Sequence, residues 1–262
     1  MRERSYGAGF AQVLGALVLA FLVLPIFAVV PASFNRSSFI KIPPQALSTR
    51  WYEAFFSDPA WLAAILTSTK VALLATFISL VIGTLAALGL ERVEARTKGL
   101  LTGLMLAPLI VPVIMTSIAL YYVMLDIGLH GSVLGLALGH TLLCMPFVVL
   151  NVGISLARLD PSLPRAAAGL GAEPLYIFRT VTLPAIRPGL AAGGAFAFIT
   201  SFDEVVISIF LSGVSAKTLP IQLWEQIRIE FTPVAAAAST VILIATVLLF
   251  LLVQFIRSRG AT

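Results

Sequence analysis

Six long apolar stretches constrain this chain more than any other feature of its sequence. A helix needs about 20 apolar residues to cross the hydrocarbon core of a bilayer. The stretches cover residues 10–30, 61–90, 99–125, 132–156, 189–211 and 233–256. Only 11% of all residues are charged, against roughly 25% in a typical soluble domain. We therefore expect an all-α membrane protein with one transmembrane domain, residues 1–262, and six transmembrane helices.

The first stretch follows Arg2 and Arg4, as a secretory signal would. A signal core spans roughly 7–15 residues, which is shorter than this stretch. We therefore predict a retained first crossing. Residues 31–58 contain Asn35, Ser37, Ser38, Pro43 and Pro44 and are predicted to form an exposed loop. Pro108, Pro112 and Pro146 lie inside predicted spans, where neighbouring helices can satisfy the backbone groups that a proline leaves free.

The distribution of Lys and Arg predicts the orientation, because cytoplasmic segments carry an excess of these residues. With a cytoplasmic N-terminus and six crossings, eleven cationic residues fall inside and five outside. The inside set is Arg2, Arg4, Arg92, Arg96, Lys98, Arg158, Arg165, Arg179, Arg187, Arg257 and Arg259. The outside set is Arg36, Lys41, Arg50, Lys217 and Arg228. This bias predicts that both termini are cytoplasmic.

The segment 158–188 is the longest polar interruption on the predicted cytoplasmic side. Asp160 and Pro161 are typical of a helix start, and Gly171 is typical of a helix stop. Pro174 can begin a second short helix, which we expect Pro184 to end. That second helix carries several apolar side chains. It lies either on lipid head groups or in a cavity of a cytoplasmic partner.

The same segment resembles the cytoplasmic loop of permease subunits of binding-protein-dependent ABC importers. The pattern of that family is Glu-Ala-Ala, three residues, Gly, nine residues and Ile-x-Leu-Pro. The matching positions here are Ala166, Ala167, Gly171, Val181, Leu183 and Pro184. The leading Glu of the family is replaced by Arg165. The usual ion pair with the ATPase therefore requires either an acid on that subunit or a contact from the partner permease.

Other segments resemble the polyamine-type subgroup of these permeases, which imports spermidine and putrescine. They are CMPFVV at 144–149, LDPSL at 159–163, LGA at 170–172, SFDE at 201–204 and TLP at 218–220. SFN at 33–35, GTLAAL at 83–88 and the proline-rich third stretch resemble the permease family in general. The resemblance implies a type I ABC importer permease fold in the bacterial inner membrane. It also implies a second permease subunit, two ATP-binding subunits and a periplasmic substrate-binding protein that docks on the outer loops 31–58 and 212–232.

In this resemblance the chain is a non-catalytic subunit that binds no cofactor, while ATP and Mg²⁺ sit on the partner subunits. Residues of the loop couple ATP hydrolysis to movement of the crossings. By the resemblance and the apolar character of the second helix, we assign this coupling to Arg165, Ala166, Ala167, Gly171, Tyr176, Phe178, Val181, Leu183 and Pro184.

Asp203 and Glu204 lie within the fifth apolar stretch. An acid near the bilayer centre costs roughly 2.5–3.5 kcal/mol, so such residues normally face a bundle interior, a partner or a pathway. A carboxylate in the pathway attracts a cationic passenger. The alternative is an acid pair with a structural role. Lys70 has a similar predicted depth and is expected to lie near one of the two acids, unless it reaches out to the outer interface.

Four small residues recur at every fourth position of the fifth stretch, which allows close helix approach. They are Gly189, Gly193, Ala197 and Ser201. Their partner is either another permease subunit or a helix of the same chain. Three isolated polar residues in predicted spans, His140, Asn151 and Gln254, are expected to form interhelical hydrogen bonds.

The chain contains no phosphate-binding loop of the form GxxxxGK[ST], no HExxH, no CxxC and no defensible Ser/His/Asp arrangement. Two other classes of function remain as alternatives. A stand-alone secondary transporter requires an internal repeat and more intramembrane acids, and an intramembrane enzyme requires a nucleophile and a base. The passenger also stays open, because related permeases carry opines, phosphonates, thiamine or iron.

Overall fold

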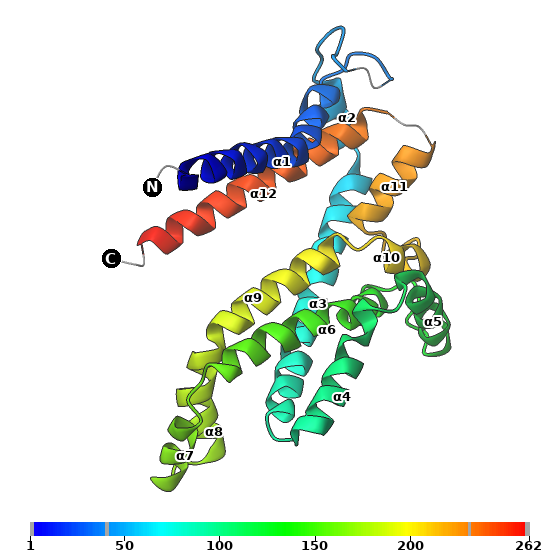
Figure 1. The fold of residues 1–262 in the computed structure, drawn as a ribbon. Helices are drawn as coiled ribbons and strands as arrows, with labels where there is room; N and C mark the ends of the chain where they lie inside the picture. Colours follow the sequence, from blue (N-terminus) through cyan, green and yellow to red (C-terminus); the bar gives the residue numbers. More distant parts are fainter. Residues whose placement is uncertain (1–2, 40–41, 230–231, 260–262) are drawn as a thin grey trace. The chain divides into compact units, whose positions relative to one another are not determined.

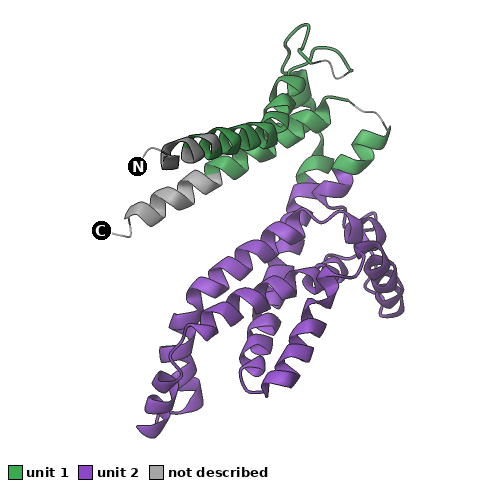
Figure 2. Cartoon of the chain, viewed as in Figure 1, with its two compact units in different colours: residues 1–62, 223–262 green, residues 63–222 purple. Residues whose placement is uncertain are grey.

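The structure is a computed structural model that describes the backbone of residues 3–39, 42–229 and 232–259. Side chains are described for residue 9 and for 11–39, 42–229 and 232–248. The side chains of Arg2, Arg4, Lys41, Gln254, Arg257 and Arg259 lie outside these ranges. Within them the chain is built from helices, as expected, without a strand. It forms two compact units, residues 1–62 with 223–262 and residues 63–222 (Figure 2).

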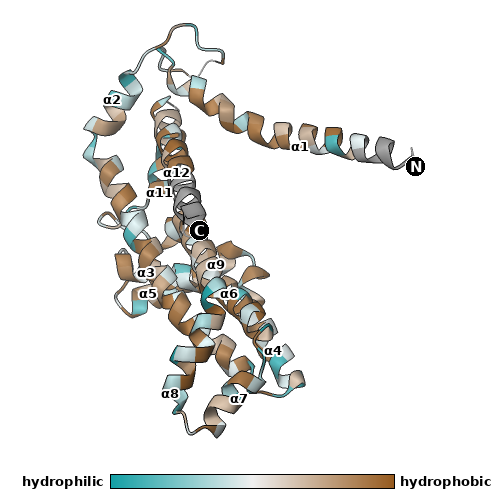
Figure 3. Cartoon of the chain, turned by 90° about the vertical axis from the view of Figure 1, so that its left-hand side faces the viewer, coloured by the Kyte–Doolittle hydropathy of each residue, from teal (hydrophilic) through white to brown (hydrophobic). Residues whose placement is uncertain are grey.

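Four helical segments of the described chain are long and apolar enough to cross a membrane. They are Ala11–Ser33, Pro59–Leu90, Val133–Ala157 and Pro174–Phe202. A fifth is possible if the bent pair Ala95–Leu109 and Val113–Asp126 counts as one span. Hydrophobic residues predominate along α1 and recur along the other long helices (Figure 3).

The first unit contains α1 (Glu3–Ser33), α2 (Arg50–Ser57), α12 (Val234–Arg259) and most of α11 (Leu219–Ile229). Helix α1 contacts α12, and its buried residues lie at its C-terminal end; Figure 3 shows that the two helices diverge from there. The predicted exposed loop 31–58 is more ordered than expected, because buried polar groups anchor it. Ser33 is fully buried and its hydroxyl lies 2.6 Å from that of Tyr52. The indole N–H of Trp51 donates to the carbonyl oxygen of Asn35 at 2.6 Å.

The second unit is organised around α6, which packs along α9 and contacts α10 (Figure 1). Its elements are most of α3 (Pro59–Leu90), α4 (Ala95–Leu106), η1 (Ala107–Leu109), α5 (Val113–Asp126), α6 (Val133–Ala157), α7 (Ser162–Gly169), α8 (Pro174–Ile177), η2 (Phe178–Thr182), α9 (Leu183–Phe202), α10 (Val206–Leu211) and the start of α11 (Leu219–Ile229).

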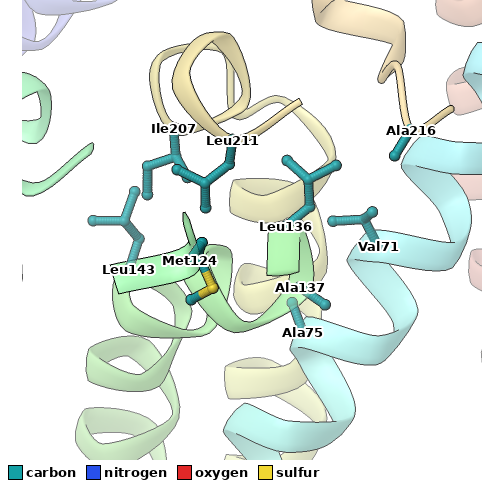
Figure 4. Close-up of a cluster of buried hydrophobic side chains, with 9 residues drawn as sticks. All are labelled: Val71, Ala75, Met124, Leu136, Ala137, Leu143, Ile207, Leu211 and Ala216. Atoms are coloured by element: carbon teal, nitrogen blue, oxygen red, sulfur yellow. The ribbon is translucent and has the colours of Figure 1, made fainter. Parts of the chain in front are cut away.

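Two buried apolar clusters hold this unit together. One joins α3, α5, α6 and α10 through the side chains labelled in Figure 4, among them Val71, Met124, Leu136 and Ile207. The other joins α3, α6 and α9, with Val148 and Ile186 fully buried at its centre. Because α6 contributes to both clusters, it fixes where α9 and α10 lie.

The third predicted crossing is broken rather than continuous. Its two parts meet at an angle of 91°, and Pro108 lies in the 3₁₀ turn that ends the first part. Pro112 is the N-cap residue of α5. A proline lacks the N–H of a helical hydrogen bond and disfavours helical geometry in the residue before it. The two prolines therefore account for the end of one helix and the start of the next.

The fifth predicted crossing, 189–211, also differs from the expectation. Helix α9 ends at Phe202, the residues Asp203–Val205 are not helical, and α10 is a separate short helix. At its other end the helix continues through Pro184, which was expected to stop it. The π-helical turn η2 directly precedes this proline. A wider turn lets the chain pass an interrupted hydrogen-bond ladder, so the helical path runs unbroken from Pro174 to Phe202.

Candidate functional site

A pocket of about 410 Å³ lies where the two interrupted helical segments of the second unit come together. One wall is the bend that contains Pro108 and Pro112, and another is formed by Leu143 and Phe147 of α6. Thr200 and Glu204, at the end of α9 and in the break after it, complete the lining. A carboxylate is thus the charged group of a mainly apolar cavity, which is the usual composition of a site for a small ligand.

The Glu204 carboxylate is positioned by the short helix that follows it. Its Oε1 accepts a hydrogen bond of 2.8 Å from the backbone N–H of Ile207. The first N–H groups of a helix have no partner within the helix, and the N-terminus favours negative charge. Glu204 therefore caps α10 and is half-buried, whereas the neighbouring Asp203 is exposed. The two acids occupy different environments, although they are adjacent in sequence.

The predicted pairing of Lys70 with these acids is not formed. Lys70 is exposed on α3 and makes no ion pair with Asp203 or Glu204 in the described part of the chain. The prediction placed Lys70 and Asp203 at equal depth on continuous helices. Because α9 ends at Phe202 and the backbone turns there, the depth of Asp203 does not follow from its position in the apolar stretch.

The four small residues of α9 face α6 of the same chain, and all four are buried. A Cβ atom on Gly189 would lie 2.5 Å from the backbone oxygen of Asn151, and one on Gly193 would lie 2.9 Å from Cα of Val148. Ala197 accepts a hydrogen bond of 3.2 Å from the Cys144 thiol through its carbonyl oxygen. Of the two partners considered, this stripe contacts the helix within its own chain.

The isolated polar residues of the spans behave differently from one another. His140 on α6 forms the expected interhelical hydrogen bonds, with Ser201 of α9 and Ser208 of α10. Asn151 instead donates to the carbonyl oxygen of Phe147 in its own helix, at 2.8 Å. Gln254 lies outside the residues whose side chains are described.

The loop 158–188 folds into two short helices joined by a tight turn. At the end of α7 the N–H of Ala172 bonds the carbonyl oxygen of Ala167 at 3.1 Å, and the N–H of Gly171 bonds that of Ala168 at 2.9 Å. This hydrogen-bond pair defines a Schellman cap, whose central residue needs a left-handed backbone. Gly171 has φ +84°, which explains physically why this sequence pattern has glycine at that position.

The start of α7 is capped as predicted, although the helix begins one residue later than expected. The Asp160 carboxylate accepts a hydrogen bond of 2.8 Å from the backbone N–H of Ser162. Hydrogen bonds from Ser162, and secondarily the charge of Arg165, hold the pKa of the Asp160 carboxyl below its usual value. The folded loop therefore stabilises the ionised form of Asp160 relative to the protonated form.

The predicted coupling residues are spread over the surface and base of this loop. Arg165, Ala166, Gly171, Tyr176 and Pro184 are exposed, whereas Ala167, Phe178, Val181 and Leu183 are half-buried. Large apolar side chains are also exposed here, including Leu170 at 90% and Leu175 at 58%. A loop that exposes so much apolar surface is typical of an interaction site.

Sequence reasoning missed two parts of the site. The pocket-lining role of Pro108 and Pro112 was not foreseen, although both prolines were recognised as interruptions. The link from His140 to two different helices was also not foreseen, because the break that it spans contains neither proline nor glycine. A histidine in an apolar run with serines in a later run was the available signal.

The fold and the site together define a class of protein. Helices interrupted within apolar segments, with a carboxylate at the interruption and a pocket beside it, are characteristic of membrane transport proteins, where non-helical backbone is tolerated only against protein or a cavity. Residues 79–259 match the family described as binding-protein-dependent transport system inner membrane component. The chain belongs to this family, and is a multi-pass permease subunit of an ABC importer.

Comparison with characterised proteins agrees with this assignment over nearly the full length. The chain is 30% identical over 248 residues to the spermidine/putrescine transport system permease protein PotC of Escherichia coli (strain K12), with 94% of each chain covered. It is 31% identical over 252 residues to the putrescine transport system permease protein PotI of the same organism, covering 93% of this chain and 89% of the relative.

A solved structure shows the same fold at lower sequence identity. The chain superposes with a TM-score of 0.73 and 17% identity on a chain from the crystal structure of a bacterial ABC transporter involved in the import of the acidic polysaccharide alginate, and 97% of each chain is covered. The identification as an importer permease therefore rests on the family match and the polyamine permeases, and the fold is common to importers of dissimilar solutes.

Proposed function

We propose that this chain forms half of the translocation pathway for a small cationic solute of the polyamine class. The observation that carries the proposal is the Glu204 carboxylate in the wall of the pocket between the two helix breaks. The similarity to PotC and PotI, which are named as polyamine permeases, supports the same class of solute. Asp203, exposed beside Glu204, adds a second negative charge to this part of the pathway.

The electrostatic reason is direct. Opposite charges about 4 Å apart attract by roughly 1 kcal/mol in water and by several times more at the lower effective dielectric of a protein surface. A polyamine carries more than one ammonium group and has an aliphatic chain between them. A pocket with apolar walls and a carboxylate suits both parts of such a molecule. The sequence predicts Lys70 beside these acids in the pathway, whereas in the proposal the pathway charge comes from Glu204 and Asp203 alone.

In the proposed topology the chain crosses the inner membrane six times, with both termini and the loop 158–188 in the cytoplasm. The excess of Lys and Arg in the inside segments supports this orientation. The bent pair α4–η1 and α5 then forms the third crossing, and α9 with α10 forms the fifth. The outer loops 31–58 and 212–232 receive the periplasmic substrate-binding protein.

The chain works in this proposal with a second permease subunit and two ATP-binding subunits. Those subunits bind ATP and Mg²⁺ and hydrolyse the ATP, while this chain binds no cofactor and catalyses no reaction. The exposed apolar side chains of α7, the turn at Gly171 and α8 supply the contact surface for one ATP-binding subunit. Arg165 is exposed at this surface, and we expect it to face an acid on the ATP-binding subunit.

The helical path from Pro174 to Phe202 provides a mechanical connection between this surface and the acids. It begins in the coupling loop and ends one residue before Asp203. A movement of α8 that accompanies ATP binding is transmitted along one helix to the break beside the pocket. The crossings can then open the pathway alternately to the two sides of the membrane.

Two other functions compete with this proposal. A permease for an opine, a phosphonate, thiamine or iron uses the same fold, and of these solutes the phosphonate is anionic and would be repelled by Glu204 and Asp203. A stand-alone secondary transporter would move its solute without ATP-binding subunits. Both are separated from the proposal by measuring which solute moves and what drives it.

The test is uptake by the complete importer reconstituted in liposomes, with labelled spermidine, putrescine, a phosphonate and thiamine as solutes. We expect ATP-dependent uptake of a polyamine, and Glu204→Gln, which removes the charge from the pocket wall but keeps an acceptor oxygen for the N–H of Ile207, is expected to abolish it while the complex still assembles. Asp126→Asn, which removes an exposed acid at the end of α5, is the matched control and should transport normally. Normal polyamine uptake by Glu204→Gln, or uptake by this chain alone, would contradict the proposal.

A further inference from the structure

A single buried side chain on α6 connects the two helices that flank the break next to the pocket. His140 is 1% exposed. Its Nδ1 lies 3.1 Å from the carbonyl oxygen and 2.9 Å from Oγ of Ser201, the second-last residue of α9. Its Nε2 lies 3.2 Å from Oγ of Ser208 on α10. One imidazole thus contacts both sides of the segment Asp203–Val205.

The protonation pattern of this imidazole follows from its partners. A carbonyl oxygen can only accept a hydrogen bond, so Nδ1 carries the proton and donates to Ser201. Nε2 is then an acceptor, and the hydroxyl of Ser208 donates to it. The last carbonyl groups of a helix have no partner within the helix. His140 satisfies one of these at the end of α9 and at the same time ties the first turn of α10 to the same point.

The packing around His140 makes this arrangement specific for the break. A Cβ atom on the neighbouring Gly139 would lie 2.7 Å from Cδ2 of Leu211, so α10 approaches the α6 backbone directly beside the imidazole. Glu204 lies between the two serines in sequence and caps α10 through Ile207. Its place in the pocket wall therefore depends on where α10 begins relative to the end of α9.

We infer that His140 is a positioning residue of the permease, which brackets the Asp203–Val205 break and thereby holds the Glu204 carboxylate in the wall of the pocket. This residue does not line the pocket itself, so it acts on the solute through Glu204. The consequence for transport rests on the proposed function, whereas the consequence for the geometry of the break does not.

Thr141 offers a matched control on α6. It directly follows His140, is also buried, and its hydroxyl donates to the carbonyl oxygen of Ala137 at 2.7 Å. This hydrogen bond stays within α6, and Thr141 does not line the pocket. Thr141→Val therefore removes a buried hydrogen bond of α6 that joins neither α9 nor α10, and separates a general effect on α6 from the role assigned to His140.

The first arm of the test is uptake of labelled spermidine or putrescine by the complete importer. In His140→Leu we expect KM to rise about tenfold with little change in maximal rate per assembled complex, since about 1.4 kcal/mol corresponds to a factor of ten and the two lost hydrogen bonds are of that order. Ser208→Ala should raise KM in the same direction, and the double variant should resemble His140→Leu. Thr141→Val should leave KM unchanged.

The second arm measures the break directly in the assembled complex. Nitroxide labels at Ala195 of α9 and Ile209 of α10, both exposed, are introduced in the Cys144→Ala background. We expect a narrow distribution of label-to-label distances when His140 is present, and a shifted or broadened distribution in His140→Leu or Ser208→Ala. Ser208→Ala provides the test if the His140→Leu complex does not assemble. An unchanged distribution, or an equal rise of KM in Thr141→Val, would overturn the inference. Altered distances with no uptake of any polyamine by the wild type would instead contradict the proposed function.

Discussion

The close approach of α9 to α6 can be tested with two adjacent glycines of α9, only one of which faces the α6 backbone. A Cβ atom on Gly193 would lie 2.9 Å from Cα of Val148, a backbone atom of α6. A Cβ atom on Gly194 would lie 3.4 Å from Cδ1 of Leu80, the end of a side chain on α3. The substitutions Gly193→Ala and Gly194→Ala therefore add the same atom to the same helix, in one case against a backbone and in the other at ordinary contact distance.

The expected magnitude follows from these distances. Ordinary contacts begin at 3.4 Å, so the Gly193 variant needs a displacement of about 0.5 Å (3.4 minus 2.9) between two packed helices. Overpacking of this kind costs about 1–3 kcal/mol. Replacing glycine by alanine within a helix is worth about 1 kcal/mol in favour of alanine, and this gain is common to both variants. The difference between the two variants isolates the packing cost, about 1–3 kcal/mol.

The measurement is the thermal unfolding midpoint of the purified importer complex in detergent. A difference of 1 kcal/mol moves Tm by about 2–4 °C for a unit of this size, so Gly193→Ala should melt about 2–12 °C below Gly194→Ala. Gly189→Ala should be at least as unstable as Gly193→Ala, because its Cβ would lie 2.5 Å from the backbone oxygen of Asn151. Equal Tm values for the adjacent variants would refute the assignment of the small-residue stripe to the contact with α6.

Two further predictions concern the loop 158–188. Gly171→Ala forces an alanine to φ +84°, which costs about 1–2 kcal/mol, so ATP-driven uptake should fall. Gly169→Ala, in the helical last turn of α7, is the control and should transport normally. Equal uptake by both variants would contradict the role of the turn. Asp160 has a pKa below its usual value, so its contribution to α7 is complete above the ordinary pKa of about 4 and is lost as pH falls through the lower, folded pKa. The protection factors of the amides of residues 162–169, which are corrected for the intrinsic pH dependence of hydrogen exchange, should accordingly fall at low pH in the wild type and change less in Asp160→Asn. Identical pH profiles of the protection factors would count against the cap.

Local signals in the sequence account for much of the helical layout and for the turn in the loop. The apolar stretch 61–90 lies within α3, which spans Pro59–Leu90, because an apolar run of that length has few alternatives to a helix. The turn at Gly171 was predictable for a similar reason, since it depends on backbone geometry that glycine alone adopts readily. In both cases the information lies within a few residues of the element that it determines.

The breaks were harder to foresee because they depend on contacts between distant segments. The bend at Pro108 and Pro112 is marked by prolines, but prolines also occur inside unbroken membrane helices, as Pro146 does in α6. The break at Asp203–Val205 has no such marker. It is compensated by His140, more than sixty residues earlier in the chain, so no local pattern reveals it. The prediction that Lys70 pairs with one of the acids assumed a continuous helix through this stretch, whereas α9 ends at Phe202.

The acid and the break at this position stabilise each other. A carboxylate within an apolar stretch is costly unless hydrogen-bond donors surround it, and an uncapped helix start inside a protein leaves N–H groups without partners. Both costs are reduced at Glu204, because the N–H of Ile207 at the start of α10 donates to the carboxylate and each group thereby gains a partner. One carbonyl group at the end of α9, that of Ser201, is compensated separately through the imidazole of His140. A helix that ran continuously through 189–211 would remove that donor and leave the acid without its partner. The break is therefore the feature that allows this chain to keep a charged group beside the pocket.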